Sequence, residues 1–259
     1  MPLYDTIGSG YDLTRRADPY IVERLIRLLD VRPQEKFLDV ACGTGNYALA
    51  IAAEVNGHAY GIDHSARMIE SGKKKGDSVV WCIGAAESLP FRSETFSGVT
   101  CTLAIHHFKS MRRPFEEIFR VLANGRFVLF TATSEQMEYY WLTEYFPGAM
   151  RKSIRQMPTY GRIVRNLKCA GFRNVHEEKY DVSSQLQDLF LYSGKHRPEI
   201  YLNRRVRSGI STFANLADSS EIDDGCKRLC RDIRSGWIRK VMSAYTHDGG
   251  DYLFLVAEK

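Results

Sequence analysis

The chain has 259 residues, of which 44% are hydrophobic and 26% are charged, and this ordinary globular balance argues against an intrinsically disordered protein. No uninterrupted apolar run approaches the roughly 18 residues at which a membrane span is predicted, and the amino-terminal segment carries acids and lacks the apolar region of a signal peptide. With a formal net charge of +5, we expect a cytoplasmic protein without a membrane span.

The first half of the chain alternates strand-like and helix-like segments with short breaks. FLDVA (37–41) is a short apolar run before a glycine-rich turn, which is typical of a buried parallel strand, and NYALAIAAEV (46–55) follows with strong helix formers. Strands alternating with helices in this way predict an α/β protein with a parallel sheet and right-handed crossovers. The remaining expected elements are strands at 58–63, 79–84, 97–104 and 126–133, a helix capped by Ser65, and a helix at about 114–122.

The second half of the chain changes character. A helix is expected near 160–170, followed by a strand at 172–182 and a final strand at 251–258, and the two strands can pair as an antiparallel edge. The Arg-rich, largely helical stretch between them is too long for a passive loop. We therefore expect one domain, 1–259, with a cofactor-binding core (1–134) and helical substrate-cap regions (135–160 and 183–250).

The glycines at 43 and 45 fall directly between a predicted strand and a predicted helix. Glycine permits a tight turn there and lets backbone N–H groups approach a ligand closely. Asp63 ends the second strand and can accept hydrogen bonds from both hydroxyls of an adenosyl ribose, so the pattern predicts a site for an adenosine-containing cofactor. Gly43, Gly45 and Ala48 also satisfy the dinucleotide fingerprint G-x-G-x-x-G/A, and the loop alone therefore does not separate a methyltransferase from a dehydrogenase.

Four segments, in a fixed order around and after this loop, distinguish a methyltransferase from a dehydrogenase. They are LDVACGTG (38–45), GIDHSARMIESGKKK (61–75), GAAESLPF (84–91), and TLAIHHF (102–108) followed by RPFEEIFRVL. In this order they resemble the motifs of class I S-adenosylmethionine-dependent methyltransferases, especially the branch that contains ubiquinone/menaquinone C-methyltransferases. The resemblance covers residues 4–133 well and the last strands loosely.

The resemblance implies a fold and a cofactor. The expected fold is Rossmann-like, with a seven-stranded, mostly parallel sheet in the order 3-2-1-4-5-7-6, the last strand antiparallel, and a helical carboxyl-terminal insertion or cap. The expected cofactor is S-adenosyl-L-methionine, with S-adenosyl-L-homocysteine as its product. No metal site is expected, because the six cysteines lack the paired C-x-x-C or His cluster of a metal centre and are better explained as structural thiols.

The resemblance also implies which residues hold the cofactor. Asp39 would help to hold the methionine amino group, Asp63 the ribose, and Met68 would lie beside the adenine. Ala41 replaces the first glycine of the family motif, a variant that requires a negative φ there, and Ala85 stands where an acid often accepts from the adenine amino group. The full expected set is Tyr11, Asp39, Ala41, Gly43, Gly45, Asn46, Asp63, His64, Met68, Ala85, Ala86, Glu87 and Leu103.

Methyl transfer is an in-line displacement, so the protein has chiefly to align the acceptor, exclude water and, where needed, remove a proton. His106 and His107 are the candidate general bases, because their ordinary pKa suits proton transfer near neutrality. Strand-like alternation would turn one of them toward the site and the other away. Tyr4 and Tyr11 belong to an amino-terminal segment that, by resemblance, folds over the cofactor, although anchoring of the first helix explains them equally well.

The acceptor side of the site is harder to predict. The aromatic segment after the fifth strand places Tyr139, Tyr140 and Trp141 as candidate substrate-binding residues, with ordinary helix packing as the alternative. Arg204 is a candidate for binding an anionic group. Residues 151–259 hold 20 Lys and Arg against 13 Asp and Glu, but these cations are interleaved with acids, which favours solvated helix faces over nucleic-acid binding.

We therefore expect an S-adenosylmethionine-dependent methyltransferase that acts on a small-molecule acceptor, as a monomer or a homodimer. Two alternatives stay open at this point. One is an RNA or protein methyltransferase that uses the basic carboxyl-terminal half. The other is a non-catalytic S-adenosylmethionine-binding protein that kept the fold and lost the reaction.

Overall fold

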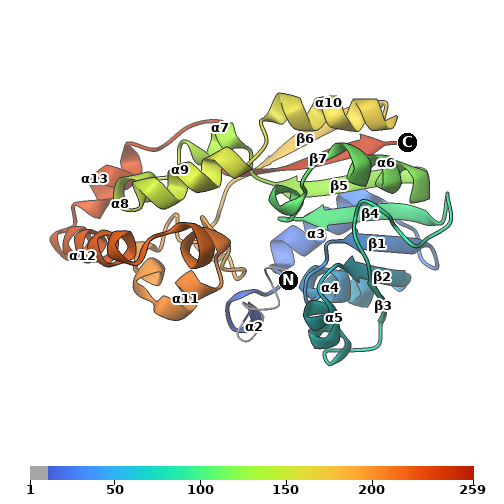
Figure 1. Ribbon diagram of the computed structural model, residues 1–259, viewed down its shortest axis with the longest axis horizontal. Helices are drawn as coiled ribbons and strands as arrows, with labels where there is room; N and C mark the ends of the chain where they lie inside the picture. The colour runs from blue at the N-terminus through green and yellow to red at the C-terminus, as the bar shows by residue number, and fades with distance from the viewer. Residues whose placement is uncertain (1–10) are drawn as a thin grey trace.

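A seven-stranded sheet forms the centre of the protein, and a group of helices projects from one of its ends (Figure 1). The structure is a computed structural model, and it describes residues 11–259. The strands are β1 (Lys36–Val40), β2 (His58–Asp63), β3 (Val79–Ile83), β4 (Phe96–Thr102), β5 (Leu122–Thr131), β6 (Asn174–Tyr180) and β7 (Tyr252–Glu258).

The order of the strands is β3-β2-β1-β4-β5-β7-β6, as predicted. β1 pairs in parallel with β2 and β4, whereas β7 lies antiparallel to both β5 and β6. The register places Asp39 of β1 beside Gly61 on one side and Thr100 on the other. β1 and β4 thus bring their carboxyl ends together at one end of the sheet, next to residues 132–158 and 181–251. Ligands bind at this end in open α/β sheets.

Helices cover both faces of the sheet. On one face, α3 (Pro19–Leu29) and α4 (Asn46–Val55) share a buried cluster with Phe37, Ala59 and Val79. On the other face, α6 (Arg112–Val121) and α10 (Tyr160–Ala170) pack against each other and belong to a second cluster. α5 (Ala66–Lys73) contacts β2 and β3, and Ser65 caps it by accepting from the backbone N–H of Met68.

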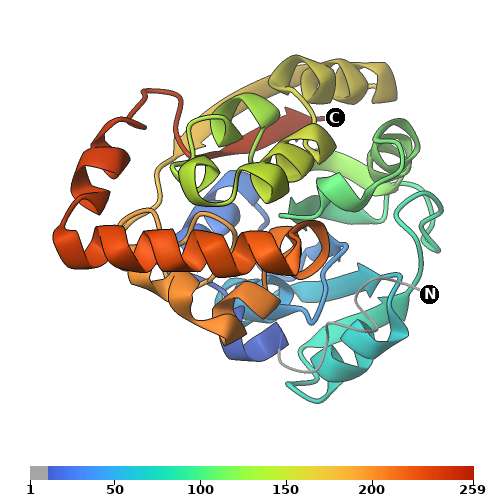
Figure 2. The same cartoon turned by 60° about the vertical axis from the view of Figure 1, so that its left-hand side comes forward.

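The helices beyond the carboxyl ends of the strands form the cap, which comprises residues 132–158 and 181–251. In Figure 2, α12 crosses the front of the cap above α11. Residues 183–197, expected to be helical, form turns instead. The remaining elements are α2 (Tyr11–Thr14), η1 (Ile105–His107), α7 (Ser134–Met137), α8 (Leu142–Tyr145), α9 (Pro147–Gln156), η2 (Pro198–Leu202), α11 (Arg204–Ser208), the π-helix η3 (Thr212–Leu216), α12 (Ser219–Ser235) and α13 (Ile238–Ser243).

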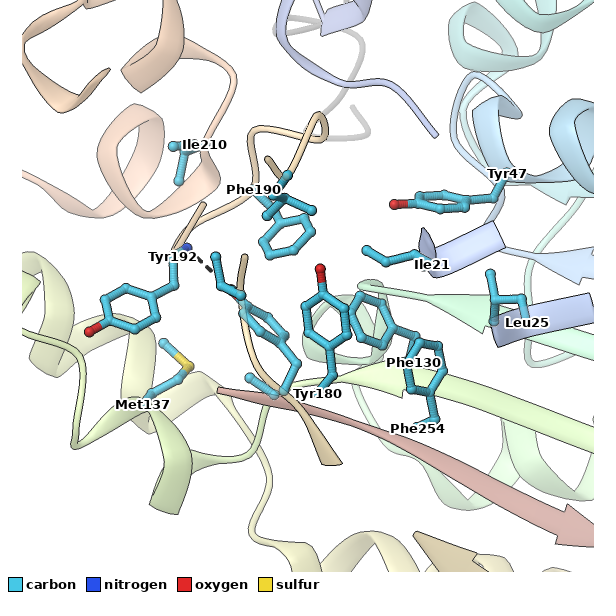
Figure 3. Close-up of a cluster of buried hydrophobic side chains, with 14 of the residues drawn as sticks. Ile21, Leu25, Tyr47, Phe130, Met137, Tyr180, Phe190, Tyr192, Ile210 and Phe254 are labelled. Carbon is cyan, nitrogen blue, oxygen red and sulfur yellow. Dashed lines mark hydrogen bonds between the residues drawn. The ribbon is translucent and has the colours of Figure 1, made fainter. Parts of the chain in front are cut away.

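The cap and the sheet share one apolar cluster. Phe130 of β5 stacks on Phe254 of β7 at 4.5 Å between ring centroids, and Phe190 of the cap meets Phe130 edge to face. Figure 3 shows this cluster continuing from Ile21 of α3, across the two strands, to Ile210 in the cap. The cap is thus packed on the sheet by buried side chains, and a cavity between the two has fixed walls. Among the described residues, no helix has the length and apolar character needed to cross a membrane.

Candidate functional site

A cavity of about 620 Å³ lies at the carboxyl ends of the parallel strands. This volume is in the range of small-molecule sites, roughly 300–1,000 Å³. We call the residues from 39 to 109 that line it the motif lining, and those from 131 to 252 the cap lining. Of the residues predicted from the sequence, those that line it are Asp39, Ala41, Gly43, Asn46, Asp63, His64, Met68, Ala85, Ala86, Glu87, Leu103, His106 and His107.

The loop after β1 turns sharply at Ala41. Its φ is +56°, so the expectation of a negative φ at this position is wrong. The left-handed conformation costs a non-glycine residue about 1–2 kcal/mol. The turn lets the next residue, Cys42, donate its N–H to the carbonyl of Ile62 at 3.0 Å, which prolongs the β1–β2 pairing into the loop.

Gly43 presents its backbone to the cavity. Its φ is +58°, its N–H donates to Asp63 Oδ2 at 2.9 Å, and a methyl group added at its Cα would meet no atom of residues 11–259 within 4 Å. The loop therefore leaves open space on the cavity side of this glycine. The N-terminal end of α4 follows directly, with the positive end of its dipole at the same place.

Gly45 does not line the cavity, so its predicted role in binding the cofactor gains no support from the structure and stays a prediction. Its N–H is taken by the carbonyl of Cys42 at 2.9 Å, and it is the N-cap of α4 with a φ of +72°. A methyl group added here would overlap the ring of Trp81. The glycine is required by the turn and by this close approach from behind the loop.

Two carboxylates lie beneath the loop. Asp63 accepts from Gly43 N–H through one oxygen and from Ser65 N–H through the other, at 2.9 Å each, so its position is held from both sides. Asp39 accepts from the Thr100 hydroxyl at 2.8 Å. Burial, together with the nearby charge of Asp63, raises the pKa of Asp39 to about 7 even though the Thr100 hydrogen bond opposes the shift. A cation placed against this pair would favour the ionised form of Asp39.

Other members of the motif lining have the chemistry of a nucleoside site. Met68 is buried, and Ala86 is buried beside the more exposed Ala85 and Glu87, which gives an apolar floor with a polar rim. Thr102, at the end of β4, has a buried hydroxyl that has no hydrogen-bond partner within residues 11–259. Because an unpartnered buried hydroxyl is costly, Thr102 is suited to a ligand in the cavity.

His106 and His107 both line the cavity, so the expected alternation is wrong. The chain leaves the strand at Thr102 and forms the 3₁₀ turn η1, which brings the two rings to 3.8 Å between centroids. Burial lowers the pKa of His106 well below its ordinary value, with help from His107 and Arg15. Burial and His64 lower the pKa of His107 to about 4. Both imidazoles are therefore neutral at pH 7, and both are weaker bases than the sequence predicted.

Three residues that the sequence analysis missed lie at this cavity. Arg15 donates to both oxygens of Asp188, from Nε at 2.6 Å and from Nη2 at 3.2 Å, and the Tyr47 hydroxyl donates to Asp188 Oδ2 at 3.0 Å. All three line the cavity, and Asp188 is 1% exposed. Asp188 lies in an irregular segment that no motif marks, and only the fold brings it near Arg15, 173 residues earlier.

The amino-terminal segment is also bound to the glycine loop. Asp12 accepts from the Thr44 hydroxyl and from Lys75 Nζ, each at 2.6 Å, and Lys75 in turn donates to Asn46 at 2.7 Å. These contacts hold residues 12–15 beside the cavity. Tyr4 and the side chain of Tyr11, which were predicted to close over the cofactor, lie outside the described residues.

The aromatic segment after β5 packs within the cap and does not line this cavity, so its role in substrate binding stays a prediction. The Tyr140 hydroxyl donates to the carbonyl of Asp251, and Trp141 Nε1 donates to that of Lys195 at 3.1 Å. Tyr139 is 48% exposed and stacks on His247. None of the three lines the cavity, because α7 ends just before them and the chain turns away; Met137 is the neighbour that reaches it.

Arg204 is exposed at the start of α11 and also does not line the cavity. The structure therefore does not bring it to this cavity, and its role in binding an anionic group stays a prediction. The cysteines are free thiols, and burial raises the pKa values of Cys42 and Cys101 well above the ordinary value. Among residues 11–259 there is no group of three His, Cys, Asp or Glu side chains placed to hold a metal ion.

Comparisons with known proteins agree with this geometry. Residues 38–130 match the methyltransferase domain family. A demethylmenaquinone methyltransferase from Symbiobacterium thermophilum is 32% identical over 219 residues, which cover 74% of this chain and 82% of the relative. A crystal structure of a methyltransferase candidate from an antibiotic biosynthesis pathway of Anabaena variabilis is 31% identical, with a TM-score of 0.85 over 95% of this chain and 99% of that chain.

More distant structures share the fold. A phosphoethanolamine N-methyltransferase from Haemonchus contortus, solved with S-adenosyl-L-methionine, matches with a TM-score of 0.59 at 19% identity. That match covers 99% of this chain and 56% of the other. At this identity the similarity concerns the fold alone.

Proposed function

Because the chain belongs to the class I S-adenosylmethionine-dependent methyltransferases, we propose that it transfers the methyl group to a small, uncharged and largely apolar acceptor held by the cap lining. One observation carries this proposal. Asp188 is the only charged side chain of the cap lining, and its charge is balanced by Arg15. The cap lining therefore offers no free charge to an ionic acceptor. The apolar members of the lining include Met137, Met157, Phe190, Leu191 and Ile210.

The cofactor fits the motif lining on three grounds. Gly43 leaves open space, Thr102 has an unpartnered buried hydroxyl, and Asp39 and Asp63 provide two carboxylates at the end of adjacent strands. We propose that Asp39 holds the amino group, Asp63 the ribose hydroxyls, and Met68 and Ala86 the adenine. When bound, S-adenosylmethionine supplies an activated methyl group on a sulfonium. The acidic pair favours this assignment over a dinucleotide, and membership of the family excludes a dehydrogenase.

The remaining chemistry rests on positioning. The packed cap excludes water from the buried wall of the cavity, and the rigid cap lining orients the acceptor, which is the main requirement of an in-line displacement. We propose that His106 and His107 accept hydrogen bonds from the acceptor as neutral imidazoles. Their lowered pKa values make them poor general bases at pH 7.

The names of relatives support a small acceptor. That of the Symbiobacterium relative designates demethylmenaquinone as its acceptor. The cap lining of this chain has two hydroxyls that hydrogen-bond to each other, those of Ser153 and Thr212, at 2.9 Å. These hydroxyls, with Gln156 at the rim, provide polar partners for one or two oxygen atoms on an otherwise apolar molecule.

The test is an acceptor panel read by release of S-adenosylhomocysteine. Neutral phenols and quinols, the reduced quinol form of demethylmenaquinone among them, are compared with amines, phosphorylated amines, carboxylates and a short RNA. Turnover is expected among the neutral apolar acceptors and is expected to disappear in Asp63→Ala. Turnover confined to ionic acceptors or to RNA would contradict the proposed acceptor class. Tight S-adenosylhomocysteine binding without turnover on any acceptor would contradict catalysis itself.

A further inference from the structure

We propose that Trp81 is a positioning residue for the cofactor loop, holding Gly43 and Gly45 at the height that the cofactor requires. Trp81 lies on β3, does not line the cavity, and belongs to none of the motifs that carry the family resemblance. The inference rests on the assignment of the motif lining to the cofactor. It adds a residue that acts through the loop from the side opposite the ligand.

The sheet register places Trp81 behind the loop. β3 is an edge strand, and Trp81 is the direct register partner of Gly61 on β2. A methyl group added at Gly61 would lie 3.1 Å from Cε3 and Cζ3 of the indole and 3.1 Å from Cys42 Sγ. Because Gly61 has no side chain, the indole can lie across β2 and reach toward the loop that follows β1.

Two more glycines receive the far edge of the same ring. A methyl group at Gly45 would overlap Cη2 and Cζ3 of Trp81, and one at Gly72 of α5 would lie 2.8 Å from Cη2. Real Cβ atoms do not approach other atoms this closely. Three glycines from β2, α5 and the N-cap of α4 thus form a slot for one indole ring. The Trp81 Nε1–H points to the carbonyl of Gly76, at 3.5 Å.

The loop therefore has two different faces. A methyl group at Gly43 would meet no atom of the described part of the chain within 4 Å, because this face is open to the cavity, whereas one at Gly45 would meet the indole. The Gly43 N–H is already directed to Asp63, and the Gly45 N–H to the carbonyl of Cys42. These two hydrogen bonds restrict sideways movement of the loop. Contact with the Trp81 ring then limits how far the loop can move away from the cavity. A smaller side chain at position 81 would leave a void into which the loop can sink.

The test compares Trp81→Leu and Trp81→Phe with Trp237→Leu, a matched control on an exposed tryptophan (52%) at the far end of the cap. Dissociation constants of S-adenosylhomocysteine are measured by calorimetry well below each variant's melting temperature. We expect Trp81→Leu to weaken binding about tenfold, equivalent to ~1.4 kcal/mol, Trp81→Phe to weaken it less, and Trp237→Leu to leave it unchanged. A purely structural role would lower the melting temperature of Trp81→Leu without changing its affinity.

Enlarging Gly72 and shrinking Trp81 in the same chain tests the contact separately from a simple loss of packing. Gly72→Ala should weaken binding alone, because its methyl group would lie 2.8 Å from Cη2 of the indole and 3.2 Å from the carbonyl oxygen of Thr44 in the loop. Trp81→Leu in the same chain should recover the part of the loss that comes from the indole. Gly72 lies in a helix at an ordinary φ, so alanine itself carries no backbone penalty there. Additive losses in the double variant would overturn the inference.

Fluorescence provides a readout that does not depend on activity. In the Trp141→Phe/Trp237→Phe background, Trp81 is the single tryptophan, and its emission should change saturably with S-adenosylhomocysteine at the calorimetric dissociation constant. No change at saturating ligand would count against contact through the loop. If both Asp63→Ala and Trp81→Leu bind S-adenosylhomocysteine normally, the cofactor site itself is misplaced. If Asp63→Ala loses binding and Trp81→Leu binds normally, only the proposed role of Trp81 is contradicted.

Discussion

The motif lining and the cap lining form one cavity but are built in different ways. The motif lining comes from a continuous run of strands and turns between residues 39 and 109, whereas the cap lining is drawn from separate segments between 131 and 252. The motif lining holds its key groups by short-range bonds, such as that from Gly43 to Asp63. The cap lining depends on packing between distant segments. The comparison teaches that the proposed donor site is formed by residues close together in the sequence, whereas the proposed acceptor site depends on the whole fold.

The largest effect is expected from Asp63→Ala, which breaks the motif lining alone. The variant removes the acceptor of the Gly43 and Ser65 N–H groups as well as the proposed ribose contact. Loss of two or three charge-assisted hydrogen bonds corresponds to about 3–4 kcal/mol, or at least a hundredfold weaker S-adenosylhomocysteine binding by calorimetry. Undiminished affinity in a folded Asp63→Ala protein would show that the cofactor lies elsewhere.

Asp188→Asn tests the cap side. It removes the negative charge that pairs with Arg15 Nε at 2.6 Å, and breaking such a pair typically costs about 3 kcal/mol of folding free energy. We expect a lower melting temperature and a higher KM for the acceptor, with S-adenosylhomocysteine affinity within about threefold of wild type.

The matched control for Asp188→Asn is Arg15→Met/Asp188→Asn. Removing both charges should recover stability relative to the single variant, because the ion pair is then removed as a whole and not broken at one end. A double variant less stable than Asp188→Asn would contradict the ion-pair account. A large loss of cofactor affinity in Asp188→Asn would mean that the two linings are not separable.

The pH dependence of cofactor binding tests Asp39. Because its pKa is raised to about 7 in the free protein, the carboxyl group is mostly neutral at pH 6 and mostly ionised at pH 8. Only the ionised form attracts the cationic amino group, so S-adenosylhomocysteine affinity should rise about tenfold from pH 6 to pH 8. Asp39→Asn should bind weakly with little pH dependence. An unchanged slope in Asp39→Asn would assign the titration to another group.

The smallest effects are expected from Tyr139→Ala and Arg204→Ala. Both side chains are exposed and outside the cavity, and such substitutions usually change stability by less than about 0.5 kcal/mol. The acceptor KM and kcat should stay within about twofold of wild type in both variants. A tenfold rise in the acceptor KM would show that these residues contribute to substrate binding from outside the cap lining.

The sequence by itself determined the strands, their order through the family resemblance, and the donor loop with Asp39 and Asp63, because hydrophobic periodicity and motif spacing are local properties. It could not show that Ala41 has a positive φ or that both histidines face the cavity, since each depends on how the chain leaves a strand inside the packed sheet.

Tertiary structure alone decided which distant side chains meet. It placed Arg15 on Asp188 across 173 residues, put Trp81 behind Gly45, and buried Tyr140 and Trp141 in the cap. The physical reason is that burial and ion pairing are settled by three-dimensional packing, whereas a linear pattern records only the tendency of each segment. The methyl donor could therefore be inferred from the order of motifs, and the class of acceptor only from the cavity that the cap completes.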